Sequence, residues 1–134
     1  MPASIPVTGP RCAIVVDDSR AMRSILRKAL EERGFDVHEA SNGREALALL
    51  ERIQTPDLAL VDWNMPVMDG LELIALLRRS PRFEQMAIAM VTSETDPARI
   101  EQALRAGADE YIMKPLSGEV LRERLILLEE EISR

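Results

Sequence analysis

The sequence has one cysteine, no long apolar run and no excess of basic residues. Cys12 alone cannot form an internal disulfide, which favours a reducing compartment and therefore a cytoplasmic location. No apolar stretch approaches the roughly 20 residues that a membrane-spanning helix needs, so we expect no membrane partner. Residues 1–10 also lack the charged start and apolar middle of a secretory signal. The net charge of −6 argues against nucleic acid as the main partner, because phosphate binding needs a basic face.

What the sequence does contain is enough for one domain. Hydrophobic residues make up 46% of the 134 positions, which can fill a core, and charged residues make up 30%. Residues 1–10 contain three prolines and show no apolar periodicity. We therefore expect a flexible leader over 1–10 and a single domain over 11–134.

Short apolar segments alternate along the chain with segments of helical periodicity. We expect strands at about 12–16, 36–40, 58–61, 87–91 and 111–113, and helices at about 20–33, 46–53, 71–77, 97–106 and 118–132. Such alternation predicts parallel strands with right-handed crossovers, and so an α/β fold with helices on both faces of one sheet. The pattern leaves the order of the strands open.

Polar residues stand where the apolar strands end. Asp17 and Asp18 follow the first strand, Asp62 follows the third, Thr92 follows the fourth and Lys114 follows the fifth. Open parallel sheets place their chemistry at this edge. Carboxylates there suit Mg²⁺, which takes oxygen ligands and keeps several waters. A carboxylate can also act as a nucleophile toward phosphorus, while a metal ion, a lysine and a hydroxyl neutralise the phosphoryl oxygens.

Each of these residues alone has a structural interpretation. Asp17 and Asp18, just before Ser19, could be turn and capping residues, and Asp69-Gly70 is more typical of a turn than of a ligand. Their joint placement at the ends of separate strands favours a functional site.

The set resembles the receiver domain of two-component response regulators. The matching features are Asp17-Asp18, Asp62 within "VDWNMPVMDG", Thr92 in "VTS", and Lys114-Pro115. The resemblance extends over 11–134, and the sequence around Asp62 is similar to that of the stand-alone chemotaxis type. It implies a flavodoxin-like three-layer sandwich with a five-stranded parallel sheet in the order 2-1-3-4-5.

The resemblance also implies a function. Asp62 would accept a phosphoryl group from the phosphohistidine of a sensor histidine kinase or of a histidine phosphotransfer protein. Mg²⁺ would be bound by Asp18, Asp62 and the backbone carbonyl of Asn64, with Asp17 assisting through water. Thr92 and Lys114 would contact the phosphoryl oxygens. Such a protein catalyses its own phosphorylation and dephosphorylation but is a switch rather than an ordinary enzyme.

Other parts of the expected mechanism follow from the same resemblance. Tyr111 would be an aromatic switch that turns inward as Thr92 moves toward the phosphate. The Lys114–Pro115 bond would be cis, as X-Pro bonds permit. Asn64 and Glu94, at the positions that tune phosphate lifetime in this family, predict a short-lived acyl phosphate.

The last helix carries more apolar residues than one buried stripe requires. Its core stripe is Leu121, Leu125, Leu128 and Ile132. Val120, Ile126 and Leu127 lie outside it, either as scattered surface residues or as part of a target-binding face. In receivers this face is formed by the fourth helix, fifth strand and fifth helix. We expect a downstream protein partner there, and a monomer or a phosphorylation-dependent dimer.

Two alternative functions are open. A Mg²⁺-dependent phosphatase with an aspartyl nucleophile typically has an acid two positions later, where this chain has Asn64. A degenerate receiver would bind partners without phosphorylation, which the complete set of site residues argues against. His38 and Cys12 suggest no further site, and no output domain is expected after the last helix.

Overall fold

The computed structural model describes residues 11–132; the expected leader, 1–10, lies outside the described residues. The elements in chain order are β1 (Arg11–Val16), α1 (Arg20–Glu32), β2 (Phe35–Ala40), α2 (Gly43–Leu50), β3 (Leu58–Val61), α3 (Gly70–Arg78), the 3₁₀ helix η1 (Pro81–Phe83), β4 (Ala87–Thr92), α4 (Pro97–Ala106), β5 (Glu110–Met113) and α5 (Gly118–Ile132). All strand pairs are parallel, and their order β2-β1-β3-β4-β5 confirms the order implied by the resemblance.

The burial of each strand follows its sequence. β3 and β4 are buried at every position, as continuous apolar runs in the middle of a parallel sheet should be. β2 lies at an edge, and there Phe35 and Val37 are buried while Asp36 between them is exposed. The second strand can mix apolar and polar residues because, at the edge of the sheet, it is buried at only part of its positions.

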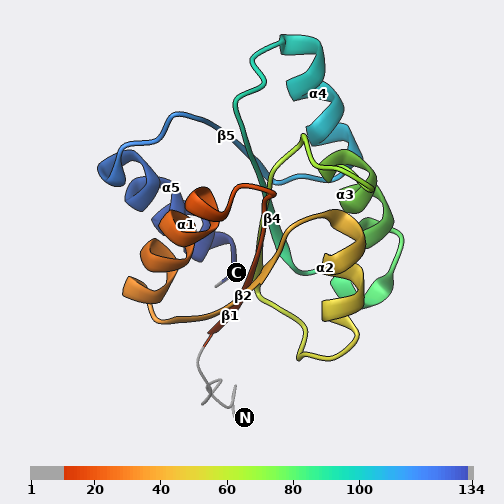
Figure 1. Cartoon of the computed structure of the whole chain (residues 1–134), viewed down its shortest axis with the longest axis horizontal. Helices are drawn as coiled ribbons and strands as arrows, with labels where there is room; N and C mark the ends of the chain where they lie inside the picture. The colour runs from red at the N-terminus through yellow and green to blue at the C-terminus, as the bar shows by residue number, and fades with distance from the viewer. Residues whose placement is uncertain (1–10, 133–134) are drawn as a thin grey trace.

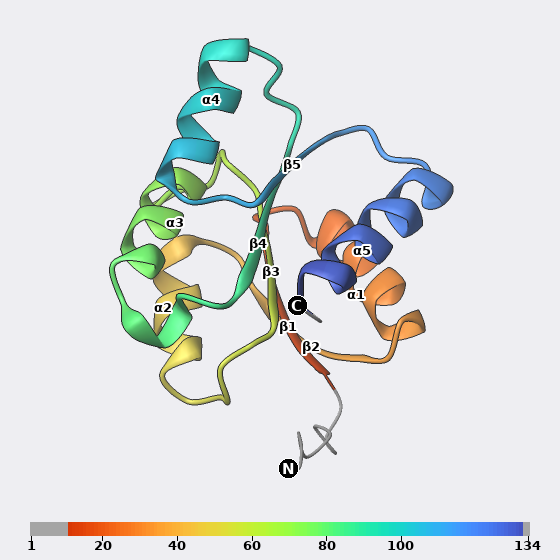
Figure 2. The same ribbon diagram turned by 180° about the vertical axis from the view of Figure 1, so that it is seen from behind.

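Helices cover both faces of the sheet, as the alternation predicted. Helices α1 and α5 lie together on one face, and α2, α3 and α4 lie on the other (Figure 1). The view from behind shows the same two layers (Figure 2). Leucines of α1 and α5 fill the first interface, namely Leu26, Leu30, Leu121, Leu125 and Leu128. Burying each such side chain contributes about 1.5–3 kcal/mol, so these stripes hold the layers together.

Capping residues set most helix ends near where the sequence indicated, but α2 begins and ends three residues earlier than predicted, at Gly43 and Leu50, because Asn42 caps it. The Ser19 hydroxyl accepts a hydrogen bond from the Met22 N–H at 3.2 Å, and Gly107 ends α4 with a φ of +123°. Asp69 forms a capping box with Glu72 at the start of α3. The Asp69-Gly70 pair is thus a helix start rather than a free turn. The short helix η1 was not predicted, because a three-residue element carries no periodicity.

Arg78 joins several segments at the amino ends of the strands. Its guanidinium donates to the carbonyl oxygens of Gly107 at 2.9 Å, Phe83 at 2.9 Å and Met86 at 2.8 Å. It also forms an ion pair with Asp109 at 2.9 Å. One side chain therefore fixes the carboxyl end of α4 and the segment leading into β4.

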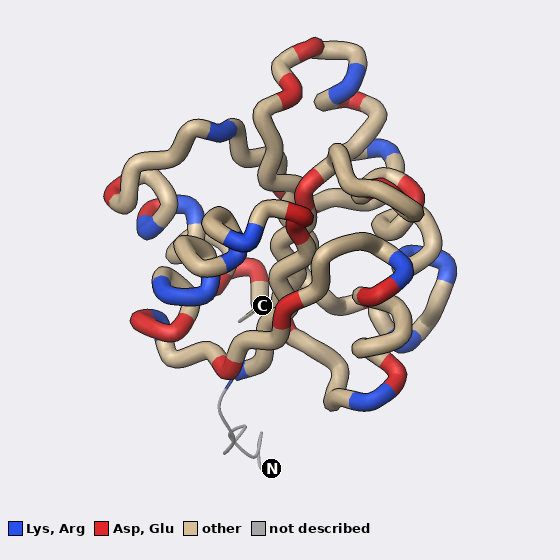
Figure 3. The backbone as a smooth tube through the Cα atoms, viewed as in Figure 1, with Lys and Arg blue, Asp and Glu red and all other residues tan. Residues whose placement is uncertain are grey.

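Charges of both signs are interspersed along the backbone rather than separated onto two faces (Figure 3). Within residues 11–132, no helix is long and apolar enough to cross a membrane.

The start of α3 packs directly on the end of β3. Gly70 donates its backbone N–H to the carbonyl oxygen of Trp63 at 2.9 Å. A Cβ at position 70 would lie 2.0 Å from the carbonyl oxygen of Asp62. Only glycine permits this approach, which places α3 against the backbone of the central acidic residue.

Gly70→Ala should lower the free energy of unfolding by about 1–3 kcal/mol, because the backbone of β3 or α3 must shift to admit the methyl group. Chemical denaturation measures the change. Gly118→Ala is the matched control, since a Cβ there meets no atom within 4 Å, and its stability should be unchanged or slightly higher. Equal stability of the two variants would contradict the close packing.

Candidate functional site

The sheet brings the polar residues from four strand ends to one edge. The register pairs Val16 with Val61 and Val61 with Met90, so β1, β3 and β4 end side by side. Asp17 and Asp62 follow the first two of these strands, and Thr92 is the last residue of β4. Parallel pairing alone therefore gathers residues that lie far apart in the sequence.

Three carboxylates form a cluster at this edge. Oxygen atoms of Asp17, Asp18 and Asp62 all lie within 4.8 Å of one another. Asp17 and Asp62 are buried, at 1% and 8% exposure, whereas Asp18 is exposed. All three offer the hard oxygen ligands that Mg²⁺ prefers, and the exposed member leaves a path for the ion and its waters. The donor set therefore fits a hydrated magnesium ion.

Lys114 supplies the positive charge of the site. Its ammonium lies 2.9 Å from Oδ2 of Asp17 and 3.4 Å from Oδ2 of Asp62. The other oxygen of Asp17 accepts the Ser19 N–H at 2.8 Å, and Oδ1 of Asp62 accepts the Trp63 N–H at 2.7 Å. Both buried carboxylates thus have partners for both of their oxygens. The Lys114–Pro115 bond is cis, as expected.

The surroundings of Asp62 disfavour its charged form. Burial is the largest cause that raises the pKa of Asp62 above its ordinary value, and the negative charge of Asp17 adds to it. Lys114 opposes this rise, as do hydrogen bonds from Thr92 and from the Trp63 N–H, but the pKa stays raised. A divalent cation would stabilise the charged carboxylate.

Thr92 and Tyr111 are connected through the loop between β4 and α4. Thr92 is fully buried, and its hydroxyl accepts the Glu94 N–H at 3.4 Å. Tyr111 on β5 is half-buried against the core, and its hydroxyl donates to the Glu94 carbonyl at 2.7 Å. Burial, and then the charge of Glu94, raise the pKa of Tyr111. The structure therefore holds Tyr111 turned in toward the loop.

Asn64 lies in the exposed loop after Asp62, and its role as a carbonyl ligand stays a prediction. In the same loop Val67 has a φ of +71°, and Met68 donates its N–H to the Pro66 carbonyl at 2.7 Å. His38 lies on β2 beside Asp36, with its Nε2 atom 3.9 Å from Oδ2 of Asp36. It is not part of the acidic cluster.

The sequence reasoning did not find Arg99. Its guanidinium carbon on α4 lies over the Trp63 ring, 5.2 Å from the centroid. An exposed arginine near a helix start carries no sequence signal of the ring that it covers.

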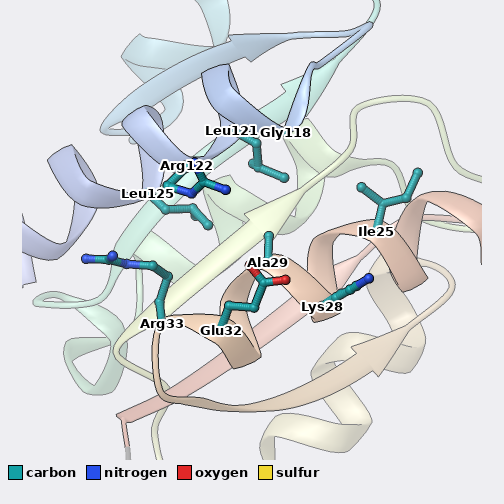
Figure 4. A pocket seen from close by; sticks show the side chains of 9 residues that line it. All are labelled: Ile25, Lys28, Ala29, Glu32, Arg33, Gly118, Leu121, Arg122 and Leu125. Carbon is teal, nitrogen blue, oxygen red and sulfur yellow. The ribbon is translucent and has the colours of Figure 1, made fainter.

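A cavity of about 260 Å³ lies between α1 and α5, away from the acidic cluster. Ile25, Ala29, Leu121 and Leu125 contribute its apolar lining (Figure 4). It contains none of the predicted site residues, so the chemistry belongs to the sheet edge rather than to this cavity.

Asp62→Asn should unfold a few degrees above the wild type at neutral pH without divalent cations. Because the folded-state pKa is raised above the ordinary value of 3.8, the folded protein binds more protons than the unfolded chain in the window above that value. Stability from this group therefore falls as pH rises through the window. Calorimetry in a chelator should show the two proteins converging below this window.

The exposed carboxylate Asp36 provides the matched control, and Asp36→Asn should unfold like the wild type. A lower unfolding temperature for Asp62→Asn at neutral pH would contradict the assigned effect of burial.

The sequence and the fold match those of known proteins. Residues 13–126 match the sequence profile described as the response regulator receiver domain. The "Chemotaxis protein CheY homolog" of Campylobacter jejuni is 44% identical over 113 residues, which cover 84% of this chain and 87% of that protein. "Chemotaxis protein CheY1" of Helicobacter pylori is 42% identical over 113 residues, with 84% and 91% covered. The solved structure of the chemotaxis response regulator CheY4 of Vibrio cholerae matches with a TM-score of 0.82 at 32% identity, covering 90% of this chain and 99% of that one. This chain therefore belongs to the response regulator receiver domain family.

Proposed function

We propose that Asp62 accepts a phosphoryl group from the phosphohistidine of a histidine kinase or phosphotransfer protein, in a reaction that depends on Mg²⁺. The observation that supports this most is the buried carboxylate of Asp62, clustered with Asp17 and Asp18 and within 3.4 Å of the Lys114 ammonium. A structural turn would not require a buried acid beside two other acids and a lysine.

In the proposed step, a carboxylate oxygen of Asp62 forms a bond to phosphorus while the phosphorus–nitrogen bond to the donor histidine breaks. The electron pair of that bond returns to the imidazole. Lys114 and the Thr92 hydroxyl lie beside Asp62 and would bind the phosphoryl oxygens. Asp17, Asp18, Asp62 and the Asn64 carbonyl would hold Mg²⁺, which supplies charge neutralisation.

The output would be a change on the α4-β5-α5 face. Leu104 on α4, Met113 on β5 and Leu127 on α5 are large apolar residues that are exposed in the structure. Tyr111 on β5 connects this face to the loop after Thr92. A target protein, or a second phosphorylated copy, would cover the exposed side chains.

Receiver domains are signalling switches rather than enzymes acting on external substrates, and self-catalysed phosphorylation and dephosphorylation are part of the proposal. Asn64 in place of an acid argues against a phosphatase. We also propose the domain limits 11–134 with a leader over 1–10. A cytoplasmic location agrees with the buried, unpaired Cys12.

The fluorescence of Trp63 should change on addition of Mg²⁺ and again on addition of beryllofluoride, which mimics an aspartyl phosphoryl group. Trp63 is 2% exposed, and its backbone N–H donates to the Asp62 carboxylate. The second change should be lost in Asp62→Asn and kept in Asp36→Asn. No response from the folded wild type would overturn the proposal and favour a receiver that binds partners without phosphorylation.

Leu127→Glu should weaken target binding, or dimerisation of the beryllofluoride form, by about tenfold or more, because an unpaired charge would be buried in the contact. Leu76→Glu on α3 is the matched control, since Leu76 is also an exposed leucine, at 38% against 47% for Leu127, but lies outside α4, β5 and α5. Partner pull-down and size-exclusion chromatography measure both variants. Identical behaviour of Leu127→Glu and wild type would exclude this face.

A further inference from the structure

The first turn of α4 has little hydrophobic anchorage. All residues of α4 are described, and among them only Ala103 is buried. Pro97, Ala98 and Arg99 at its start are exposed. Burial therefore fixes the carboxyl half of the helix, and polar contacts must hold its beginning.

Arg99 makes one of these contacts with the centre of the site. Its guanidinium stands over the face of Trp63, at a distance typical of a cation–π interaction. Trp63 is buried and directly follows Asp62, and its backbone N–H donates to Oδ1 of that carboxylate. The start of α4 is therefore two contacts away from the proposed phosphoryl acceptor.

The same turn is tied to Tyr111. Asp96, the cap of α4, donates its N–H to Oε1 of Glu94 at 3.2 Å, and the carbonyl of Glu94 accepts the Tyr111 hydroxyl. The positive charge of Arg99 also lowers the pKa of Tyr111 against the larger effect of burial. Arg99 thus contacts the residue next to Asp62, and its charge acts on the proposed switch residue.

We propose that Arg99 is a positioning residue, whose guanidinium on the Trp63 ring holds the start of α4 beside the acidic site with Tyr111 turned inward. The part of this inference that concerns switching rests on the proposed function. If Arg99 is removed, the first turn of α4 and the Glu94 carbonyl lose an attachment, and Tyr111 is held inward a smaller fraction of the time. A phosphoryl mimic that binds this conformation then binds more weakly in proportion.

The test compares wild type with Arg99→Gln, Arg99→Lys and Arg105→Gln. Arg105 is the matched control, because it lies on the same helix, is 79% exposed and, among residues 11–132, forms its ion pair within α4, with Glu101 at 2.6 Å. Amide hydrogen exchange of residues 97–100, without beryllofluoride, measures the anchorage directly. The second measurement is the concentration of beryllofluoride that gives half of the maximal change in Trp63 fluorescence, with Mg²⁺ present. It reports the effect on switching.

Arg99→Gln should speed exchange in the first turn and raise the half-maximal beryllofluoride concentration about two- to fivefold, the range expected for an exposed cation–π contact. Arg99→Lys should keep the exchange rate and the half-maximal beryllofluoride concentration close to those of the wild type, because an ammonium also binds the ring. Arg105→Gln should change neither. In a Trp63→Leu background, Arg99→Gln should no longer alter the exchange.

Unchanged exchange in Arg99→Gln, or an equal effect of Arg105→Gln, would overturn the positioning role. Altered exchange with an unchanged beryllofluoride response would overturn its link to switching. A wild type that ignores beryllofluoride would instead contradict the proposed function, and the exchange measurements would still decide whether Arg99 anchors α4.

Discussion

The ammonium group of Lys114 between two buried carboxylates is the interaction on which the site depends. Asp17 and Asp62 would repel each other at the end of the sheet, and Lys114 lies within 2.9 Å of one and 3.4 Å of the other. Three clustered carboxylates and one ammonium leave two negative charges in excess, which equals the charge of one divalent cation. The raised pKa of Asp62 has the same origin, since burial and the neighbouring acid outweigh the single lysine. Binding of a divalent cation would neutralise this excess negative charge and so stabilise the site. The cation would also favour the arrival of a phosphoryl group.

The parallel sheet makes this charge arrangement possible at low cost. The carboxyl ends of the parallel strands meet at one edge of the sheet whatever the sequences of the helices between them. The helix sequences can therefore vary without separating the site residues. Gly70 places α3 against the backbone of Asp62, and the loop containing Glu94 connects Thr92 to Tyr111. On the α3 side, backbone packing thus fixes the acidic site. On the side of Thr92 and Tyr111, hydrogen bonds through the Glu94 loop hold it. The proposed switch lies on the side held by hydrogen bonds.

The sequence predicted those features that depend on local pattern. The elements and the acidic cluster followed from apolar periodicity and from the acids where strands end, and the strand order followed from the family resemblance. The strand limits shifted by one residue at Arg11, Phe35, Thr92 and Glu110, because pairing continues beyond the segments that the sequence indicated. The contact of Arg99 with Trp63 was not predictable, because it depends on how two distant segments pack. The same is true of the close approach at Gly70, which in the sequence looks like any helix start.

The two ends of α4 are held in different ways. Arg78 binds the carbonyl oxygen of Gly107, just beyond the carboxyl end, and Ala103 is buried, whereas the amino end is attached through exposed polar groups. The carboxyl end of α4 is thus the more firmly held end, whereas the amino end is held through Arg99 on the Trp63 ring. A small displacement beside Asp62 would therefore rotate α4 about its carboxyl end. The surface of α4 would then turn as one body, and a partner could read the state of the site from the orientation of the helix.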